Sequence, residues 1–198
     1  MEKVRTFVAI NLSSEMKERL MDVQQRLRRS APPETVRWVR PQGIHLTLKF
    51  LGEVPASQIP QITAALREAC RVHTPFTFTV GGVGCFPNPR SPRVVWVGVE
   101  EESGALVALQ KSVEKAMTRL GFPRESRPFH PHLTLGRTRK GLRNTDRRRL
   151  GDAIATAGVG LLGEVSVDAV YLMRSDLRPS GAVYTALAEA RLEGERAP

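Results

Sequence analysis

One short pattern occurs twice in this chain of 198 residues, and it constrains the fold more than any other feature. His45-Leu46-Thr47-Leu48 and His132-Leu133-Thr134-Leu135 are identical, and their histidines lie 87 positions apart (132 − 45). Each copy is preceded, in the same order, by a predicted strand, a predicted helix and Pro or Gly residues that end the helix. This matched order predicts an internal duplication with two pseudo-symmetric halves.

Hydrophobic periodicity separates the expected strands from the expected helices, because side chains repeat every two residues in a strand and every 3.6 in a helix. Strands are predicted at 4–12, 44–51, 76–83, 93–99, 132–136, 165–173 and 183–190, and helices at 16–27, 57–72, 106–120 and 146–157. The expected fold class is α+β, in which two antiparallel sheets face each other across a central cleft with the helices outside. We treat 1–198 as one domain of two lobes, about 1–90 and 91–198, and leave open whether the lobes exchange strands.

The chain is strongly basic, with thirty Lys and Arg against twenty Asp and Glu, a net charge of +10 and a pI of about 10.5. Such an excess attracts polyanions, among them nucleic acids and anionic membrane surfaces. It is concentrated in the segment 137–149, which holds seven basic residues and one acid, Asp146. That segment is either a phosphate-binding rim or a solvated loop and helix face, and charge alone does not separate the two.

Several classes of protein are disfavoured by composition. No apolar run approaches the ~18 to 20 residues of a membrane span, and the N-terminus lacks the apolar core of a secretory signal. A cytoplasmic protein is therefore expected. A monomer is expected as well, although the sequence carries no signal for the oligomeric state. Cys70 and Cys85 form no CxxC pair and have no histidine at zinc-ligand spacing, so neither a disulfide nor a structural metal is indicated.

The doubled pattern also suggests a chemistry. Strand alternation places His45 and Thr47 on one face, and the second copy repeats this arrangement. Two imidazoles with pKa values near neutrality can serve as the acid and the base that metal-free phosphodiester cleavage needs, while the hydroxyls hold phosphate oxygens. A single strand histidine is more often structural, but two at equivalent places favour catalysis.

Residues next to the first copy are interpreted from the same alternation. Lys49 shares a face with His45 and Thr47, where it could lower the pKa of the histidine or contact phosphate, but a lysine at a strand end is usually solvated. Trp38, Trp96 and Phe50 are interpreted as core residues.

Further segments accompany the doubled pattern: Arg5–Ile10 (RTFVAI), Trp38–Pro41 (WVRP), Leu48–Gly52 (LKFLG) and Arg127–Pro131 (RPFHP). Together they resemble the two-histidine (2H) phosphoesterase superfamily, and within it the bacterial and archaeal RNA 2′,3′-cyclic phosphodiesterases, formerly called 2′-5′ RNA ligases. The resemblance covers essentially the whole chain.

This resemblance implies that the protein hydrolyses 2′,3′-cyclic phosphate ends of RNA to 2′-phosphomonoesters without metal or other cofactor. By position it makes His45 the proton donor to the departing 3′ oxygen and His132 the proton acceptor from water. It further implies that Thr47 and Thr134 hold the phosphate. Arg137, in the family pattern HxTxxR, would add a charge-assisted contact. Strict alternation puts Arg137 on the core face, so this last role requires the strand to end or twist after Gly136.

The remaining expectations concern the RNA partner. Phe7, Phe129 and Tyr184 are candidates for stacking on the terminal base, although each is also a core candidate. The expected partner is an RNA with a 2′,3′-cyclic phosphate end, and tRNA fragments are one candidate that the sequence does not test. Two alternatives stay open: 2′-5′ ligation, the reverse reaction, as the main role, and a non-catalytic RNA or nucleotide-binding module. The presence of both histidines and both threonines argues against the binding module.

Overall fold

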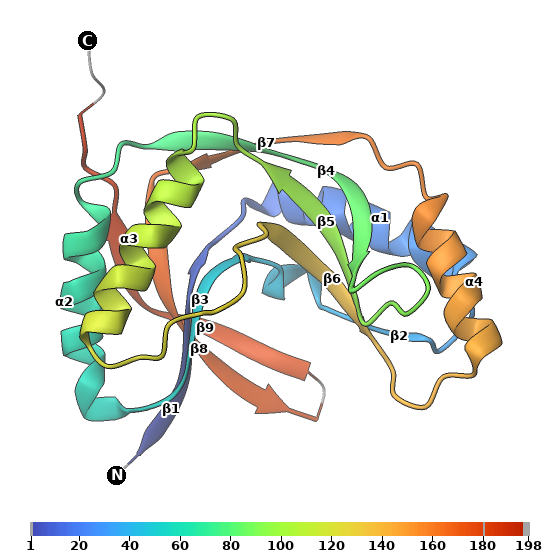
Figure 1. The fold of residues 1–198 in the computed structure, drawn as a ribbon, viewed down its shortest axis with the longest axis horizontal. Helices are drawn as coiled ribbons and strands as arrows, with labels where there is room; N and C mark the ends of the chain where they lie inside the picture. Colours follow the sequence, from blue (N-terminus) through green and yellow to red (C-terminus); the bar gives the residue numbers. More distant parts are fainter. Residues whose placement is uncertain (1, 180, 196–198) are drawn as a thin grey trace.

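The structure is a computed structural model that describes residues 2–179 and 181–195. In this part of the chain, nine strands form one antiparallel sheet that curls into a half-barrel, with four α-helices packed on its outer side (Figure 1). The strands are β1 (Lys3–Ile10), β2 (Val36–Trp38), β3 (Leu46–Pro55), β4 (Phe76–Phe86), β5 (Val94–Glu100), β6 (His132–Thr138), β7 (Leu161–Val167), β8 (Ala169–Arg178) and β9 (Gly181–Arg191). The helices are α1 (Ser14–Ser30), α2 (Ile59–Cys70), α3 (Ala105–Arg119) and α4 (Asn144–Ala155), with short 3-10 turns η1 (Pro41–Gly43) and η2 (Ala56–Gln58).

The strand order shows how the sheet is built from two parts. It runs β7-β4-β5-β6-β3-β1-β8-β9, and β2 pairs with β6 beside this path. The sequence predicted two sheets, whereas the structure has one, because the pair Leu46–Leu133 joins β3 to β6. We call the two sides of this pair the β3 half (β3, β1, β8, β9) and the β6 half (β6, β5, β4, β7). The division of the chain into lobes at about residue 90 stays a prediction.

The helices cover one face of the sheet. Helices α2 and α3 pack on each other and on the β3 half, while α1 and α4 lie against β7 and β4 of the β6 half (Figure 1). In α1 the Ser13 hydroxyl accepts the Met16 N–H at 3.2 Å, which caps the helix where the sequence predicted a start. Leu20, Leu66 and Leu109 point at the sheet and are fully buried. Each such leucine contributes roughly 2 kcal/mol of hydrophobic stabilisation.

The opposite face of the sheet carries a second, smaller apolar cluster, made of Phe7, Ala9 and Met173 with Tyr171 and Tyr184 packed against it. No helix residue belongs to this cluster. We call this side of the sheet the open face. None of the helices in the described ranges is both long and apolar enough to cross a membrane.

Candidate active site

The two copies of the repeated pattern lie side by side where the halves of the sheet meet. Leu46 in β3 pairs directly with Leu133 in β6, and both side chains are buried in the main core. Because neighbours along a strand point to opposite faces, the histidine and threonine on either side of each leucine point to the open face. The antiparallel register sets the histidine of each copy next to the threonine of the other. The expected convergence of two imidazoles and two hydroxyls is therefore present at this junction.

A β-bulge in β6 decides where Arg137 lies. On β5, Trp96 pairs with Thr134 and Val95 pairs with Gly136, so Leu135 has no partner. The extra residue shifts the alternation by one and returns Arg137 to the open face, where its side chain is exposed. Strict alternation had placed it on the core face, and the bulge supplies the change of direction that a phosphate-binding role needs.

The first copy has the same bulge at the equivalent residue, Leu48, which has no partner on β1. Beyond it, Lys49 turns toward the helices and is only 5% exposed, while Phe50 faces the open side and is 64% exposed. The predictions of a solvated Lys49 on the histidine face and of a core Phe50 were therefore wrong. Trp96 also lies on the open face, opposite Thr134, rather than in the core. Trp38 packs against the main core as predicted.

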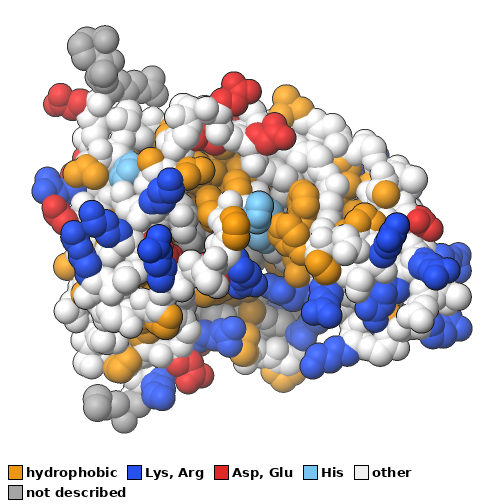
Figure 2. All heavy atoms as spheres, viewed as in Figure 1, with side chains coloured by type: hydrophobic (Ala, Val, Ile, Leu, Met, Phe, Trp, Pro, Cys, Tyr) orange, Lys and Arg blue, Asp and Glu red, His pale blue; other side chains and the backbone are white. Residues whose placement is uncertain are grey.

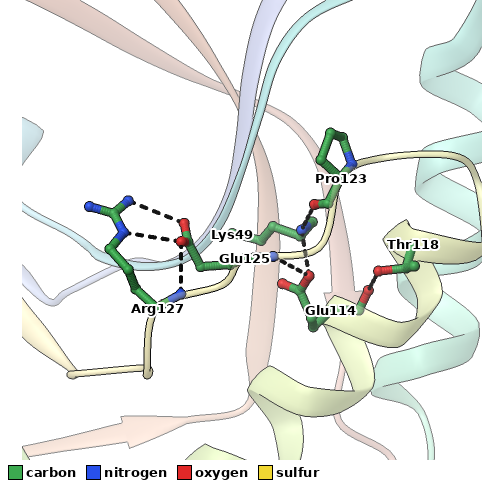
Figure 3. Close-up of polar contacts among 6 residues, drawn as sticks. All are labelled: Lys49, Glu114, Thr118, Pro123, Glu125 and Arg127. Atoms are coloured by element: carbon green, nitrogen blue, oxygen red, sulfur yellow. Dashed lines mark hydrogen bonds and ion pairs between the residues drawn. The ribbon is translucent and has the colours of Figure 1, made fainter.

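Lys49 holds a buried network behind the site (Figure 3). Its Nζ donates to Glu114 Oε1 at 2.7 Å and to the Pro123 carbonyl at 2.8 Å, and the Glu125 N–H donates to the same carboxylate oxygen at 3.0 Å. Lys49 belongs to the first motif strand, whereas 123–125 belong to the segment that leads into His132. The network thus ties the approach to the second copy to the strand of the first.

Both histidines are oriented by the same backbone contact. Nδ1 of His45 lies 2.8 Å from the Gly43 carbonyl oxygen, and Nδ1 of His132 lies 2.7 Å from that of His130. A carbonyl only accepts hydrogen bonds, so Nδ1 carries the proton in each ring. In the neutral tautomer, Nε2 of each ring is then an unprotonated base.

Aromatic rings enclose His45. Phe7 stacks on the imidazole with ring centroids 4.6 Å apart, and Tyr184 meets it edge-on at 5.0 Å. Burial lowers the pKa of His45 to about 4; the Gly43 carbonyl opposes this shift, and the charge of Lys17 adds to it. Two of the three aromatic candidates are therefore brought to the first histidine. The third, Phe129, packs partly buried against the main core.

His132 has a different surrounding. Phe86 meets its ring edge-on at 4.9 Å, and Trp96 lies tilted at 6.5 Å. Burial lowers the pKa of His132, the His130 carbonyl opposes this, and the charges of Arg137 and His130 lower the pKa further. Phe86 and Trp96 were not predicted as neighbours of the site. Only the strand pairing, which has no local sequence signal, brings them there.

The arrangement can move protons around a bound anion. Both imidazoles are neutral at pH 7, and the hydroxyls of Thr47 and Thr134 make no hydrogen bond within residues 2–179 and 181–195. In the same ranges no three His, Cys, Asp or Glu side chains come together as metal ligands. Figure 2 shows a histidine amid apolar side chains near the middle of one face, with Lys and Arg side chains on both sides of it, over α2 and α3 to its left and over β2 and α4 to its right.

Comparison with known proteins gives a family match for each half of the chain. The family profile described as "LigT like Phosphoesterase" matches residues 10–96 and again residues 97–184, so each copy of the repeated pattern falls within its own match. An RNA 2′,3′-cyclic phosphodiesterase of Methanothermobacter thermautotrophicus is 38% identical over 190 residues, which are 96% of this chain and 100% of that protein.

Solved structures agree over the same extent. A crystal structure of a Thermus thermophilus protein superposes with a TM-score of 0.79 at 31% identity, covering 97% of this chain and 100% of the other. Escherichia coli LigT complexed with 3′-AMP gives a TM-score of 0.77 at 28% identity, covering 96% and 99%.

Proposed function

The chain belongs to the LigT-like phosphoesterase family of the 2H superfamily, and from this premise we propose that it hydrolyses 2′,3′-cyclic phosphate ends of RNA to 2′-phosphomonoesters. The family resemblance inferred from the doubled pattern is thereby confirmed. One observation carries the proposal: at the β3–β6 junction two histidines, each with Nδ1 hydrogen-bonded to a backbone carbonyl, lie beside the hydroxyl groups of Thr47 and Thr134. The relatives named as RNA 2′,3′-cyclic phosphodiesterases supply the substrate class.

In the proposed reaction His132 is the base and His45 is the acid. Nε2 of His132 takes a proton from water as the water oxygen forms a bond to phosphorus. The bond from phosphorus to the 3′ oxygen breaks, and Nε2–H of His45 delivers its proton to that oxygen. The phosphate stays on the 2′ oxygen, and proton exchange with solvent restores both rings. No metal is needed in any step.

The protonation of His45 depends on the substrate. In the free site its pKa of about 4 leaves the ring neutral at pH 7. An anionic phosphate beside Nε2 favours the imidazolium and raises this pKa. Substrate binding therefore promotes protonation of His45, which is the form that acts as the acid. Arg137 and the two threonine hydroxyls hold the same phosphate through charge-assisted and neutral hydrogen bonds.

The aromatic residues have two different roles: one holds the ring of His45, and another is the candidate to stack on the terminal base. Phe7 is 2% exposed and already covered by the His45 ring, so we assign it to holding that ring. Tyr184 is partly exposed at the edge of the same ring and remains the candidate for the terminal base. Base stacking by Phe129, tRNA fragments as substrates, a monomeric state and a cytoplasmic location stay predictions.

The test is product identification with a short RNA that ends in a 2′,3′-cyclic phosphate, in the presence of EDTA. We expect a 2′-phosphate, identified by chromatography against 2′- and 3′-phosphate standards and by its removal with phosphatase. His45→Ala and His132→Ala should each slow the reaction by about 10²- to 10⁴-fold.

Each other outcome identifies a rival. A 3′-phosphate product, loss of activity in EDTA, or unchanged rates in both variants contradicts the mechanism. RNA retained without turnover indicates a binding module. A 2′-5′ linked product that dominates when a 5′-hydroxyl RNA is added indicates ligation as the main role.

A further inference from the structure

Two arginines face each other across β2 and β6 on the open face. Arg37 pairs directly with Arg137 in the antiparallel ladder. Val36 is buried and Trp38 packs against the core, so Arg37 between them points the other way, as Arg137 does. Both arginine side chains are exposed.

Such a pair is unfavourable for the sheet itself. Directly opposed residues have Cβ atoms about 5 Å apart, and like charges at that separation destabilise the pairing. Over residues 2–179 and 181–195, neither guanidinium has a carboxylate or other hydrogen-bond partner. Nearby arginines differ, since Arg139 pairs with Glu34 at 2.9 Å and Arg143 pairs with Asp146 at 2.8 Å. An anion bound between Arg37 and Arg137 would offset their repulsion.

The position of the pair indicates which anion. Arg137 lies three residues beyond Thr134 on the same face of β6, at most about 10 Å along the strand. Arg37 lies one strand to the side, along the edge of β6 that also receives β3 through Leu133. The pair is therefore adjacent to the reacting phosphate but displaced from the histidines. Further exposed basic residues follow Arg137 along the chain into α4: Arg139, Lys140, Arg143, Arg148 and Arg149.

We propose that Arg37 binds the phosphodiester immediately 5′ of the terminal nucleotide, next to the reacting phosphate that Arg137 contacts, so that the site prefers oligonucleotide ends to cyclic mononucleotides. The proposal rests on the proposed function, because it extends the RNA path from the cyclic phosphate. Guanidinium groups bind phosphate oxygens in a bidentate, planar manner. Backbone phosphates are common to all sequences, so the preference is for chain length and not for a base.

The experiment compares two substrates with the same terminal base: adenosine 2′,3′-cyclic phosphate, and the dinucleotide ApA ending in a 2′,3′-cyclic phosphate. Wild type should have the higher kcat/KM for the dinucleotide. Arg37→Gln should lower kcat/KM for the dinucleotide by about 10-fold or more, chiefly through KM, as expected for a lost hydrogen bond to a charged group. The mononucleotide should change by less than about twofold. The control is Arg119→Gln, an exposed arginine on α3 on the helix side, which should change neither.

Three results would overturn the inference. Equal losses on both substrates would place Arg37 at the reacting phosphate or in the fold. No loss on either would make it a solvated side chain, and a wild type without dinucleotide preference would remove the subsite. Thermal unfolding of Arg37→Gln should show no loss of stability, because the substitution removes a like-charge contact.

If the proposed function is wrong, the wild-type protein turns over neither substrate, which distinguishes this case from failure of the Arg37 inference. Binding of the two 2′-phosphate products, adenosine 2′-phosphate and ApA 2′-phosphate, still tests the pair in that case. The inference requires tighter binding of the dinucleotide and loss of that difference in Arg37→Gln. It also requires a weaker salt dependence of dinucleotide binding in the variant.

Discussion

The two copies of the repeated pattern are identical over four residues and differ in the next two, Lys49-Phe50 in β3 and Gly136-Arg137 in β6. Because both strands bulge at the preceding leucine, the fifth residue of each copy faces the helices and the sixth faces the open side. The β3 half thus has a buried ammonium and an exposed phenyl ring, and the β6 half has a glycine and an exposed guanidinium. The shared part fixes the histidines, and the differing part gives the two halves different electrostatic surroundings.

The largest expected effect comes from removing the buried ion pair of the β3 half, between Lys49 and Glu114. Lys49→Met should lower the free energy of unfolding by about 3–5 kcal/mol, because it leaves the largely buried Glu114 carboxylate without its cationic partner. Urea denaturation measures this change. Arg71→Met, which breaks the exposed pair with Glu68, is the control and should change the free energy of unfolding far less. The double variant Lys49→Met with Glu114→Leu should recover much of the loss, and equal effects at the two pairs would contradict the role of Lys49.

The glycine of the second copy gives the next effect. A Cβ on Gly136 would lie 2.5 Å from Val36 Cγ1 and 3.2 Å from the Arg37 carbonyl oxygen. Gly136→Ala should therefore destabilise the protein by about 1–3 kcal/mol and displace β2. Gly160→Ala, where nothing lies within 4 Å, is the matched control and should be nearly neutral by thermal unfolding. A neutral Gly136→Ala would show that β2 is not packed as tightly against β6 as described.

The sixth residue of the second copy carries the electrostatic difference. Arg137→Gln should lower kcat/KM by about 10-fold or more through the lost phosphate contact. It should also raise the pKa of His132, because the arginine charge lowers it in the wild type. On the acidic side of the pH profile, kcat/KM falls as His132 becomes protonated, and in the variant this fall should occur at a higher pH. A loss of rate without this shift of the pH profile would show that the charge of Arg137 does not affect the pKa of His132.

The smallest effect is a displacement of the pH profile. The acid must be protonated and the base neutral, and the pKa values of both free histidines lie below the ordinary value of 6.5. The optimum of kcat/KM, which reports the free enzyme, should therefore lie below pH 6.5. The optimum of kcat should lie at higher pH, because the bound phosphate raises both pKa values. An optimum of kcat/KM above pH 7 would contradict the buried, neutral state of His45.

Most elements and the four motif residues could be predicted from the sequence because they depend on local periodicity. The prediction of a single strand at 165–173 was wrong: this stretch is the end of β7 and the start of β8, which lie toward opposite ends of the strand order. The faces of Lys49, Phe50 and Arg137 could not, since the bulges at Leu48 and Leu135 arise from pairing with strands far along the chain. The single sheet depends on one bridge, Leu46–Leu133, for the same reason. A local signal for Arg37 was available, because Val36-Arg37-Trp38 alternates apolar, charged and apolar. That Arg37 lies opposite Arg137 could be seen only from the strand register in the structure.

The central claim is that two similarly built histidines perform opposite proton transfers, and a change of leaving group tests it most directly. The substrate is an RNA end whose cyclic phosphate has sulfur in place of the 3′ oxygen, because a thiolate leaves without a proton; thiol pKa values are near 8.5. Rates are measured for wild type, His45→Ala and His132→Ala on the oxygen and sulfur substrates. The account predicts that sulfur restores most of the lost rate to His45→Ala and none to His132→Ala. Restoration of His132→Ala, or of neither variant, would contradict it.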